Sequence, residues 1–138
     1  FTTLTKEGMP IIRYRTRDLT RLLPGTARTM RRMEKVTGRS DDMIILRGVN
    51  VFPTQIEECL LATPGLAPYF QIELVKDGPM DVMRVHCEPV ASGDAAPLAH
   101  AFAKRIKDVV GISVAVILNE PGGVERSQGK ARRVVDSR

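Results

Sequence analysis

Three charged side chains lie close together in the first third of the sequence: Arg39, Asp41 and Asp42. A guanidinium is a planar fork of donors that suits phosphate or ribose oxygens, and the two carboxylates supply acceptors. Gly38 and Gly48 flank this stretch, and glycine adopts backbone angles closed to other residues, so the chain can bend there or let a ligand approach closely. The stretch is therefore a candidate ligand-binding segment, with a solvated surface loop as the alternative.

A lysine near the end of the chain is the second candidate. Gly129 directly precedes Lys130 within the run from Ser127 to Arg133. A glycine beside the lysine lets an ammonium approach an anion without a neighbouring side chain in the way. The alternative is a solvated surface charge among arginines.

Basic residues are concentrated in the first third of the chain. Apolar or aromatic residues alternate with arginines from Ile11 to Arg17, which predicts a strand with one charged face, and Asp18 follows it. Asp18 either faces a ligand or pairs with the arginines beside it. The net charge of the whole chain is +5, which favours anionic partners such as nucleotides, coenzymes or nucleic acid.

Composition indicates one small domain with an aliphatic core. The chain has 138 residues, enough for one core, and contains no Trp and only 4% aromatic residues. Its only cysteines, Cys59 and Cys87, lack the spacing of a metal site, so we expect two core thiols in a reducing compartment and no metal bound by the chain. We find neither an apolar run long enough to cross a bilayer nor a signal peptide, and a cytoplasmic location is the expectation.

The apolar periodicity predicts an α+β fold. Pro53 is well placed to begin a helix that ends before Pro64 and Gly65. Ser92 or Asp94 can cap a second helix, which runs to Gly111 with the apolar stripe Leu98, Phe102, Ile106 and Val109. Strands are expected around residues 49–51, 72–74, 82–88, 113–118 and 134–135, with a turn at 77–79. From Val49 to Leu118 the order is strand, helix, strand, strand, helix, strand, a split βαββαβ layout with both helices on one face of a sheet.

The chain begins with Phe1 rather than Met and enters at once a pattern of strand, turn and strand. We therefore expect a piece of a longer polypeptide whose preceding domain is missing.

Three separated motifs together resemble the carboxyl-terminal domain of the adenylate-forming acyl-CoA synthetase superfamily. Tyr14 to Asp18 (YRTRD) resembles the ribose-binding motif of this family, Gly38 to Asp42 (GRSDD) its hinge, and Ser127 to Ala131 (SQGKA) its catalytic-lysine motif. Arg17, where most members have glycine, and the run Arg47 to Pro53 (RGVNVFP) are similar to the phenylacetate-CoA ligase branch. The motifs occur in the family's order over nearly the whole chain.

The resemblance implies a two-step reaction. A carboxylate and ATP give an acyl-adenylate and pyrophosphate, and the thiol of coenzyme A then displaces AMP to give a thioester. Lys130 is implied as the catalytic cation of the first step, Asp18 as the acceptor for the ribose hydroxyls, and Arg39 as a donor to ribose or phosphate. Asp41 matches the hinge on which the domain swings between the two steps.

In the second step Arg47, Gly48 and Val49 are implied to line the path of coenzyme A. The expected organisation is a β-hairpin segment that ends the amino-terminal domain (1–37), a hinge (38–42) and a lid domain (43–138). ATP with Mg²⁺ and the acid are implied to be bound mainly by the amino-terminal domain, which is the expected partner, so the 138 residues alone are expected not to make acyl-CoA. A homodimer is compatible with the resemblance, whereas no membrane partner is expected.

Two other classes have the same topology. A nucleic-acid-binding module stacks bases on exposed aromatic residues of its sheet, and no aromatic-rich strand motif is present here. A regulatory domain that binds a small effector at a dimer interface is the other alternative. The three motifs favour the ligase.

Overall fold

The computed structural model describes residues 1–27, 29–91, 95–126 and 133–138. The chain divides into two compact units, Phe1–Asp42 and Met43–Arg138.

The first unit contains two short antiparallel pairs nested in one hairpin. Strand β1 (Asp18–Leu19) pairs with β4 (Gly38–Arg39), and between them β2 (Leu22–Leu23) pairs with β3 (Arg32–Met33). The predicted β-hairpin region is thus present. Gly38 and Arg39, which the sequence assigned to a hinge motif, belong to its outer pair.

The strands predicted before this hairpin are not formed. Residues 1–17, all of which are described, contain no strand, although the Tyr14 amide donates to the Phe1 carbonyl at 2.8 Å and the Thr3 amide to the Ile11 carbonyl at 2.9 Å. Arg13 and Arg17 have φ angles of 52° and 66°, in the left-handed region that an extended strand excludes. The prediction of a strand from Ile11 to Arg17 was wrong because alternation of residue types does not reveal such backbone turns.

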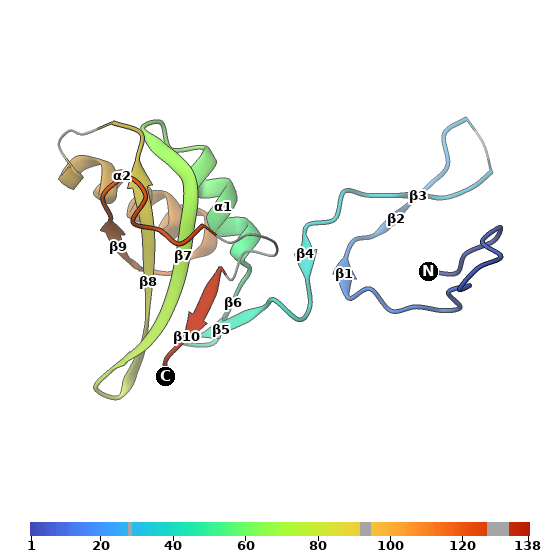
Figure 1. Cartoon of the computed structure of the whole chain (residues 1–138), viewed down its shortest axis with the longest axis horizontal. Coiled ribbons are helices and arrows are strands. Elements are labelled where there is room, and N and C mark those ends of the chain that lie inside the picture. Colours follow the sequence, from blue (N-terminus) through green and yellow to red (C-terminus); the bar gives the residue numbers. More distant parts are fainter. Residues whose placement is uncertain (28, 92–94, 127–132) are drawn as a thin grey trace. The chain divides into compact units, whose positions relative to one another are not determined.

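The second unit is built on a four-stranded sheet (Figure 1). Its strands in spatial order are β10 (Val134–Asp136), β7 (Leu66–Asp77), β8 (Met80–Pro89) and β9 (Ala115–Leu118). β7 and β8 form a long antiparallel hairpin, whereas β9 and β10 add to its two sides in parallel. The predicted turn at residues 77–79 joins the two long strands.

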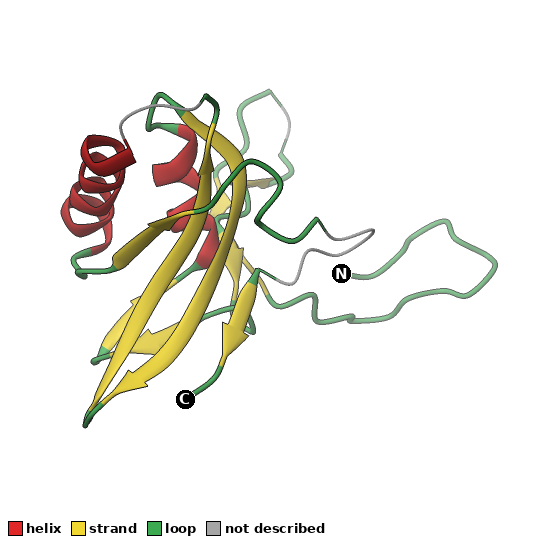
Figure 2. Ribbon diagram, turned by 60° about the vertical axis from the view of Figure 1, so that its left-hand side comes forward, coloured by secondary structure: helices red, strands yellow, loops and turns green. Residues whose placement is uncertain are grey.

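Two helices, α1 (Pro53–Leu61) and α2 (Ala95–Val110), pack on the same face of this sheet (Figure 2). Pro53 begins α1, where its missing amide hydrogen costs nothing, and the Gln55 side-chain oxygen accepts a hydrogen bond from the Phe52 amide at 3.0 Å. The predicted α+β class, with both helices on one face, is confirmed.

One strand of the predicted layout lies elsewhere. β6 (Val49–Val51) was expected in the main sheet, but it forms a separate antiparallel hairpin with β5 (Ile44–Leu46). The two-residue turn at Arg47 and Gly48 returns the chain directly onto β5, so that β6 pairs locally. The place beside β7 is taken by β10, whose Val134 pairs with Ile72.

The core fills the space between the helices and the sheet. Ile56, Phe102 and Ile106 of the helices are fully buried against Val85 and Met83 of β8 and their neighbours. The helix stripe differs from the prediction at its end: Val109 is 60% exposed, and Val110 packs on the core instead. Val110 lies four positions after Ile106, one helical turn along the same face.

A carboxylate is buried on the opposite face of the sheet. Glu88 is only 2% exposed, and its Oε1 and Oε2 accept hydrogen bonds from the two terminal guanidinium nitrogens of Arg126 at 2.8 and 2.7 Å. The Val124 amide donates to Oε1 at 2.7 Å. Hydrogen bonding by Arg126 is the main reason that the pKa of Glu88 is lowered to about 2. The carboxylate thus attaches the loop that follows β9 to the sheet.

Cys59 and Cys87 are buried and unpaired, as predicted. Burial raises the pKa of the Cys59 thiol, and it raises that of Cys87 to about 12. Within the described residues, no helix combines the length and the apolar character needed to cross a bilayer.

We expect neither thiol of the folded chain to be alkylated by iodoacetamide at mildly alkaline pH, because only an accessible thiolate reacts. Mass spectrometry should find both cysteines modified after unfolding in guanidinium chloride, which is the positive control. Rapid labelling of either thiol in the native chain would contradict the packing described here.

The pair of Glu88 and Arg126 should make stability depend on pH. The pKa of Glu88 is lower in the folded chain than its ordinary value of 4.5. The ionised carboxylate therefore contributes fully to the free energy of unfolding above pH 4.5, and this contribution is lost as the pH falls toward about 2. Urea unfolding of wild type and Glu88→Gln should therefore give a difference in unfolding free energy that shrinks over this interval. Glu73→Gln, which removes an exposed pairing with Arg84, is the control and should show a smaller difference from wild type.

Candidate nucleotide and coenzyme sites

Asp18 and Arg39, two of the predicted nucleotide-binding residues, lie opposite each other. They come from different motifs, and the pairing of β1 with β4 makes them direct cross-strand partners. Both residues are exposed. The hairpin therefore presents an acceptor and a cationic donor together, as recognition of a nucleotide requires.

Asp41, the predicted hinge residue, joins this pair through Arg39. Arg39 donates from a terminal guanidinium nitrogen to the Asp41 carboxylate at 2.8 Å, and a second arginine, Arg17, lies 3.7 Å from the same oxygen. Asp41 sits in a turn in which the Asp42 amide donates to the Arg39 carbonyl at 3.2 Å. Exposed ion pairs of this kind are worth at most about 1 kcal/mol, so Arg39 can exchange Asp41 for a bound anion at little cost.

The turn at Arg47 and Gly48, predicted to line the coenzyme path, has left-handed backbone angles at both positions. Their φ angles are 50° and 80°, and two positive values are what the type I′ turn of a two-residue hairpin requires. A Cβ atom on Gly48 would meet no atom within 4 Å, so the main chain is open to solvent on that side. Val49, the third predicted residue, is partly buried against the core.

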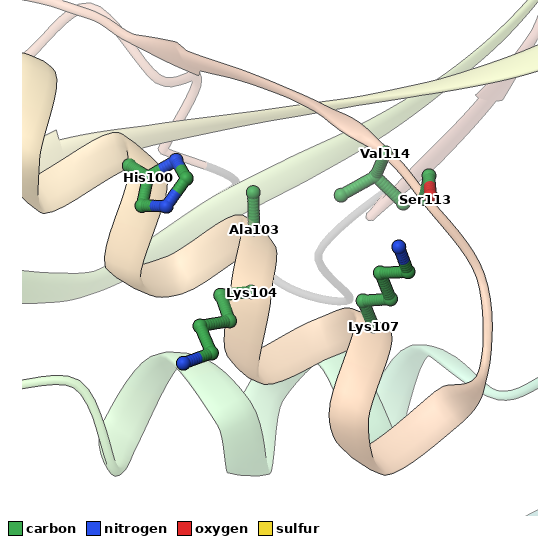
Figure 3. Close-up of a pocket in the computed structure, with 6 residues that line it drawn as sticks. All are labelled: His100, Ala103, Lys104, Lys107, Ser113 and Val114. Atoms are coloured by element: carbon green, nitrogen blue, oxygen red, sulfur yellow. The ribbon is translucent and has the colours of Figure 1, made fainter.

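Arg47 connects this turn to a pocket beside α2. Its guanidinium donates to the Ser113 carbonyl at 2.9 Å. Ser113 lines a cavity of about 340 Å³ together with Val114 and, from α2, His100, Ala103, Lys104 and Lys107. Figure 3 shows the Lys107 side chain extending toward Ser113, whereas that of Lys104 points away from it. A cation at the mouth of a pocket beside the turn suits an anionic group of a ligand.

Lys130, the predicted catalytic residue, lies outside the described residues, as does the rest of the run from Ser127 to Arg132. The residues on either side of this run are described, and both are arginines engaged with carboxylates. Arg126 binds Glu88, and Arg133 lies 2.6 Å from the Glu57 carboxylate of α1. The sequence analysis predicted neither of these two ion pairs. The sequence contains one indication of the Glu88 pair. Glu88 follows Cys87 in a predicted strand, so its carboxylate points to the sheet face opposite the core.

Metal ligation finds no support in the part of the chain that the structure describes. No three His, Cys, Asp or Glu residues there are arranged to hold a metal ion.

Comparison with known proteins gives a consistent result. The profile of the AMP-binding enzyme C-terminal domain matches residues 48–138. Phenylacetate-coenzyme A ligase from Aromatoleum evansii is 56% identical over 146 aligned positions, which include the whole of this chain but only 33% of that protein. The chain thus spans about a third of the length of the curated relatives it matches.

Solved structures with a similar fold come from the same kind of enzyme as these sequence relatives. A domain of phenylacetate-coenzyme A ligase from Bacteroides vulgatus is 34% identical, with a TM-score of 0.64 over 70% of this chain and 93% of that one. 2-Hydroxyisobutyryl-CoA ligase, solved in the postadenylation state with R3-HIB-AMP, is 29% identical, with a TM-score of 0.79 over 94% of this chain and 29% of that one. From its α+β fold and these matches, we conclude that the chain belongs to the family of AMP-binding enzyme C-terminal domains.

Proposed function

We propose that this chain is the carboxyl-terminal part of an AMP-forming ligase that converts an aryl acid, phenylacetate in the first instance, into its coenzyme A thioester. The alignment of the entire chain with the Aromatoleum evansii ligase at 56% identity is the observation that carries the proposal. The amino-terminal adenylation domain of the same polypeptide is the proposed partner. The chain's two free, buried cysteines support a cytoplasmic location, where thiols stay reduced.

The first step brings two anions together. The substrate carboxylate attacks the α-phosphorus of ATP, and negative charge builds on the phosphoryl oxygens while pyrophosphate leaves. Lys130 supplies the cation that lies between the carboxylate and the phosphate oxygens and lowers this barrier electrostatically.

Asp18 and Arg39 bind the nucleotide in this proposal. The Asp18 carboxylate accepts hydrogen bonds from the ribose hydroxyls, and Arg39 turns from Asp41 to the ribose or phosphate oxygens. Their cross-strand pairing supports a common ligand for the two side chains.

The second step requires a different pose of residues 43–138. Asp41 and its neighbours form the hinge, and the boundary of the first compact unit at Asp42 supports a pivot at this point. The thiol arm of coenzyme A then passes Gly48, where even an added Cβ would meet no atom within 4 Å. Lys107 is the candidate partner for a coenzyme phosphate, because it lines the same pocket as Ser113, whose carbonyl accepts a hydrogen bond from Arg47.

Mg²⁺ enters the proposal with ATP. In this proposal the ATP phosphates and the amino-terminal domain would hold the ion. It neutralises phosphate charge when bound.

Lys130→Ala in the full-length ligase should lower the rate of acid-dependent ATP–pyrophosphate exchange by about 100-fold to 1,000-fold, as expected for the loss of one preorganised charge at the reacting centre. Thioester formation from preformed phenylacetyl-adenylate should continue, since that step does not use the lysine. Lys76→Ala, at an exposed position of β7, is the control and should leave both rates near wild type. Normal exchange by Lys130→Ala would refute the assignment.

Gly48→Ala should show the opposite pattern. A methyl group at a φ of 80° strains the backbone by roughly 1–2 kcal/mol and narrows the coenzyme path, so thioester formation should slow while pyrophosphate exchange persists. Gly78→Ala is a matched control: this residue of the β7–β8 turn has a φ of 59° and likewise no atom within 4 Å of an added Cβ. Equal slowing of thioester formation by both variants would attribute the effect to strain alone and remove Gly48 from the path.

A further inference from the structure

The hairpin of β5 and β6 carries the proposed coenzyme turn, Arg47 and Gly48, at its tip. In the part of the chain that the structure describes, these two strands pair only with each other. A two-stranded hairpin is marginally stable at best by itself in water, so contacts with the rest of the unit must hold it in place. Leu46 and Val51 are fully buried in the core and supply apolar contacts. Apolar packing is non-directional, so directional polar contacts must fix the position of the turn.

One backbone acceptor of β5 points away from β6. In a hairpin with a two-residue turn, the residues that flank the turn form a hydrogen-bonded pair, here Leu46 and Val49. The next pair, Ile45 with Asn50, is then non-hydrogen-bonded, so the Ile45 carbonyl faces the outer edge of the strand. Arg138 donates to this carbonyl from a terminal guanidinium nitrogen at 3.3 Å. Arg138 thus holds the hairpin by its backbone, close to the turn.

Arg138 is itself fixed by two strands of the main sheet. Its Nε and one terminal nitrogen donate to the two carboxylate oxygens of Asp136 in β10 at 2.9 and 2.8 Å. The nitrogen that reaches Ile45 also donates to Asp81 of β8 at 2.8 Å. A planar fork of donors that binds a carboxylate at two points has one preferred geometry. Arg138 is therefore a rigid link between the main sheet and β5, and Figure 1 shows the end of β10 beside β5.

The tip of the hairpin has a polar contact of the same kind. Arg47 donates to the Ser113 carbonyl, which lies between α2 and β9, at 2.9 Å. In both contacts an arginine side chain binds a backbone carbonyl from a distant part of the chain, 66 positions away for Arg47 and 93 positions away for Arg138. The hairpin is thus held at its turn and along its outer edge, and Gly48 lies within the segment that is held.

We propose that Arg138 is a positioning residue for the turn of Arg47 and Gly48 in the thioester-forming step. This inference rests on the function proposed above, in which the thiol arm of coenzyme A passes Gly48. Without Arg138 the hairpin can shift over its packed face, and the turn shifts with it. Misplacement by about 1 Å can cost about 100-fold in rate, even when the altered residue lies outside the reacting centre. Arg138 acts through the turn rather than on the coenzyme.

This role predicts a defect that is confined to one half-reaction and to its rate constant. Adenylate formation is assigned above to residues outside the hairpin, so it should be spared. Lys107, the proposed partner for a coenzyme phosphate, belongs to α2, whereas Arg138 binds groups of β5, β8 and β10. Capture of coenzyme A should therefore persist, and the kcat of thioester formation should fall.

The test uses the full-length ligase and its two half-reactions. Arg138→Met should lower the kcat of thioester formation from preformed phenylacetyl-adenylate by about tenfold or more. The KM for coenzyme A and the rate of phenylacetate-dependent pyrophosphate exchange should stay within about twofold of wild type. Arg138→Lys, which keeps the charge but loses the planar fork, should recover only part of the rate.

Amide hydrogen exchange of the same proteins reports on the hairpin independently of activity. In Arg138→Met, a peptide that spans residues 44–51 should exchange faster than in wild type, because the hairpin opens more often, whereas a peptide from α2 should be unchanged. Arg84→Met is the matched control, since Arg84 of β8 also pairs with a carboxylate but with that of Glu73 in β7, at 3.4 Å. It should leave both half-reactions and exchange of residues 44–51 near wild type.

The possible outcomes separate the two proposals. A wild-type ligase without acid-dependent pyrophosphate exchange would refute the proposed function and remove the basis of this inference with it. With an active wild type, the positioning role is overturned if Arg138→Met keeps full thioester formation, loses both half-reactions to the same extent, or leaves the exchange of residues 44–51 unchanged. If thermal unfolding shows that Arg138→Met does not fold, Arg138→Lys takes its place, and an equal loss of both half-reactions again overturns the role.

Discussion

The antiparallel register between β7 and β8 is the constraint on which the second unit depends. It places Phe70 opposite Cys87, Ile72 opposite Val85 and Leu74 opposite Met83, and all six of these side chains are buried toward the helices. A slip of one residue would turn the whole set to the other face. Tyr69 and Glu88 are the chain neighbours of Phe70 and Cys87, the last pair before the register shifts, and both contact Arg126.

Burial of Glu88 explains why the loop after β9 is attached so closely. An ionised carboxylate removed from water costs several kcal/mol unless charge and hydrogen bonds compensate it. Arg126 and the Val124 amide provide this compensation from one short segment. The loop begins where the Asn119 amide donates to the Cys87 carbonyl at 2.8 Å, beside Glu88 itself. The buried charge of Glu88 therefore determines where the loop from Asn119 to Arg126 lies on the sheet.

Local patterns predicted much of this fold. Pro53, the alternation of Met83, Val85 and Cys87, and the spacing of Phe102 and Ile106 each report a property of one element, and the corresponding helices and strands are present. Patterns of this kind do not say which strands pair, so the exchange of β6 for β10 beside β7 was not foreseen. The left-handed angles at Arg13 and Arg17 also leave no trace in residue type.

The candidate site likewise contains residues that the sequence predicted and residues that it did not. Motif resemblance singled out Asp18, Arg39 and Asp41, and the hairpin brings these three together, although their roles remain proposals. Glu88 and Arg126 were missed because their significance appears only once a distant loop folds over the sheet.

The contrast between exposed and buried ion pairs has a consequence for ionic strength. Mobile ions screen an exposed pair such as Arg39 with Asp41, but they screen a pair whose carboxylate is enclosed by protein much less. Concentrated salt therefore loosens the contact between Arg39 and Asp41 first, while the loop that ends at Arg126 stays attached to the sheet through Glu88.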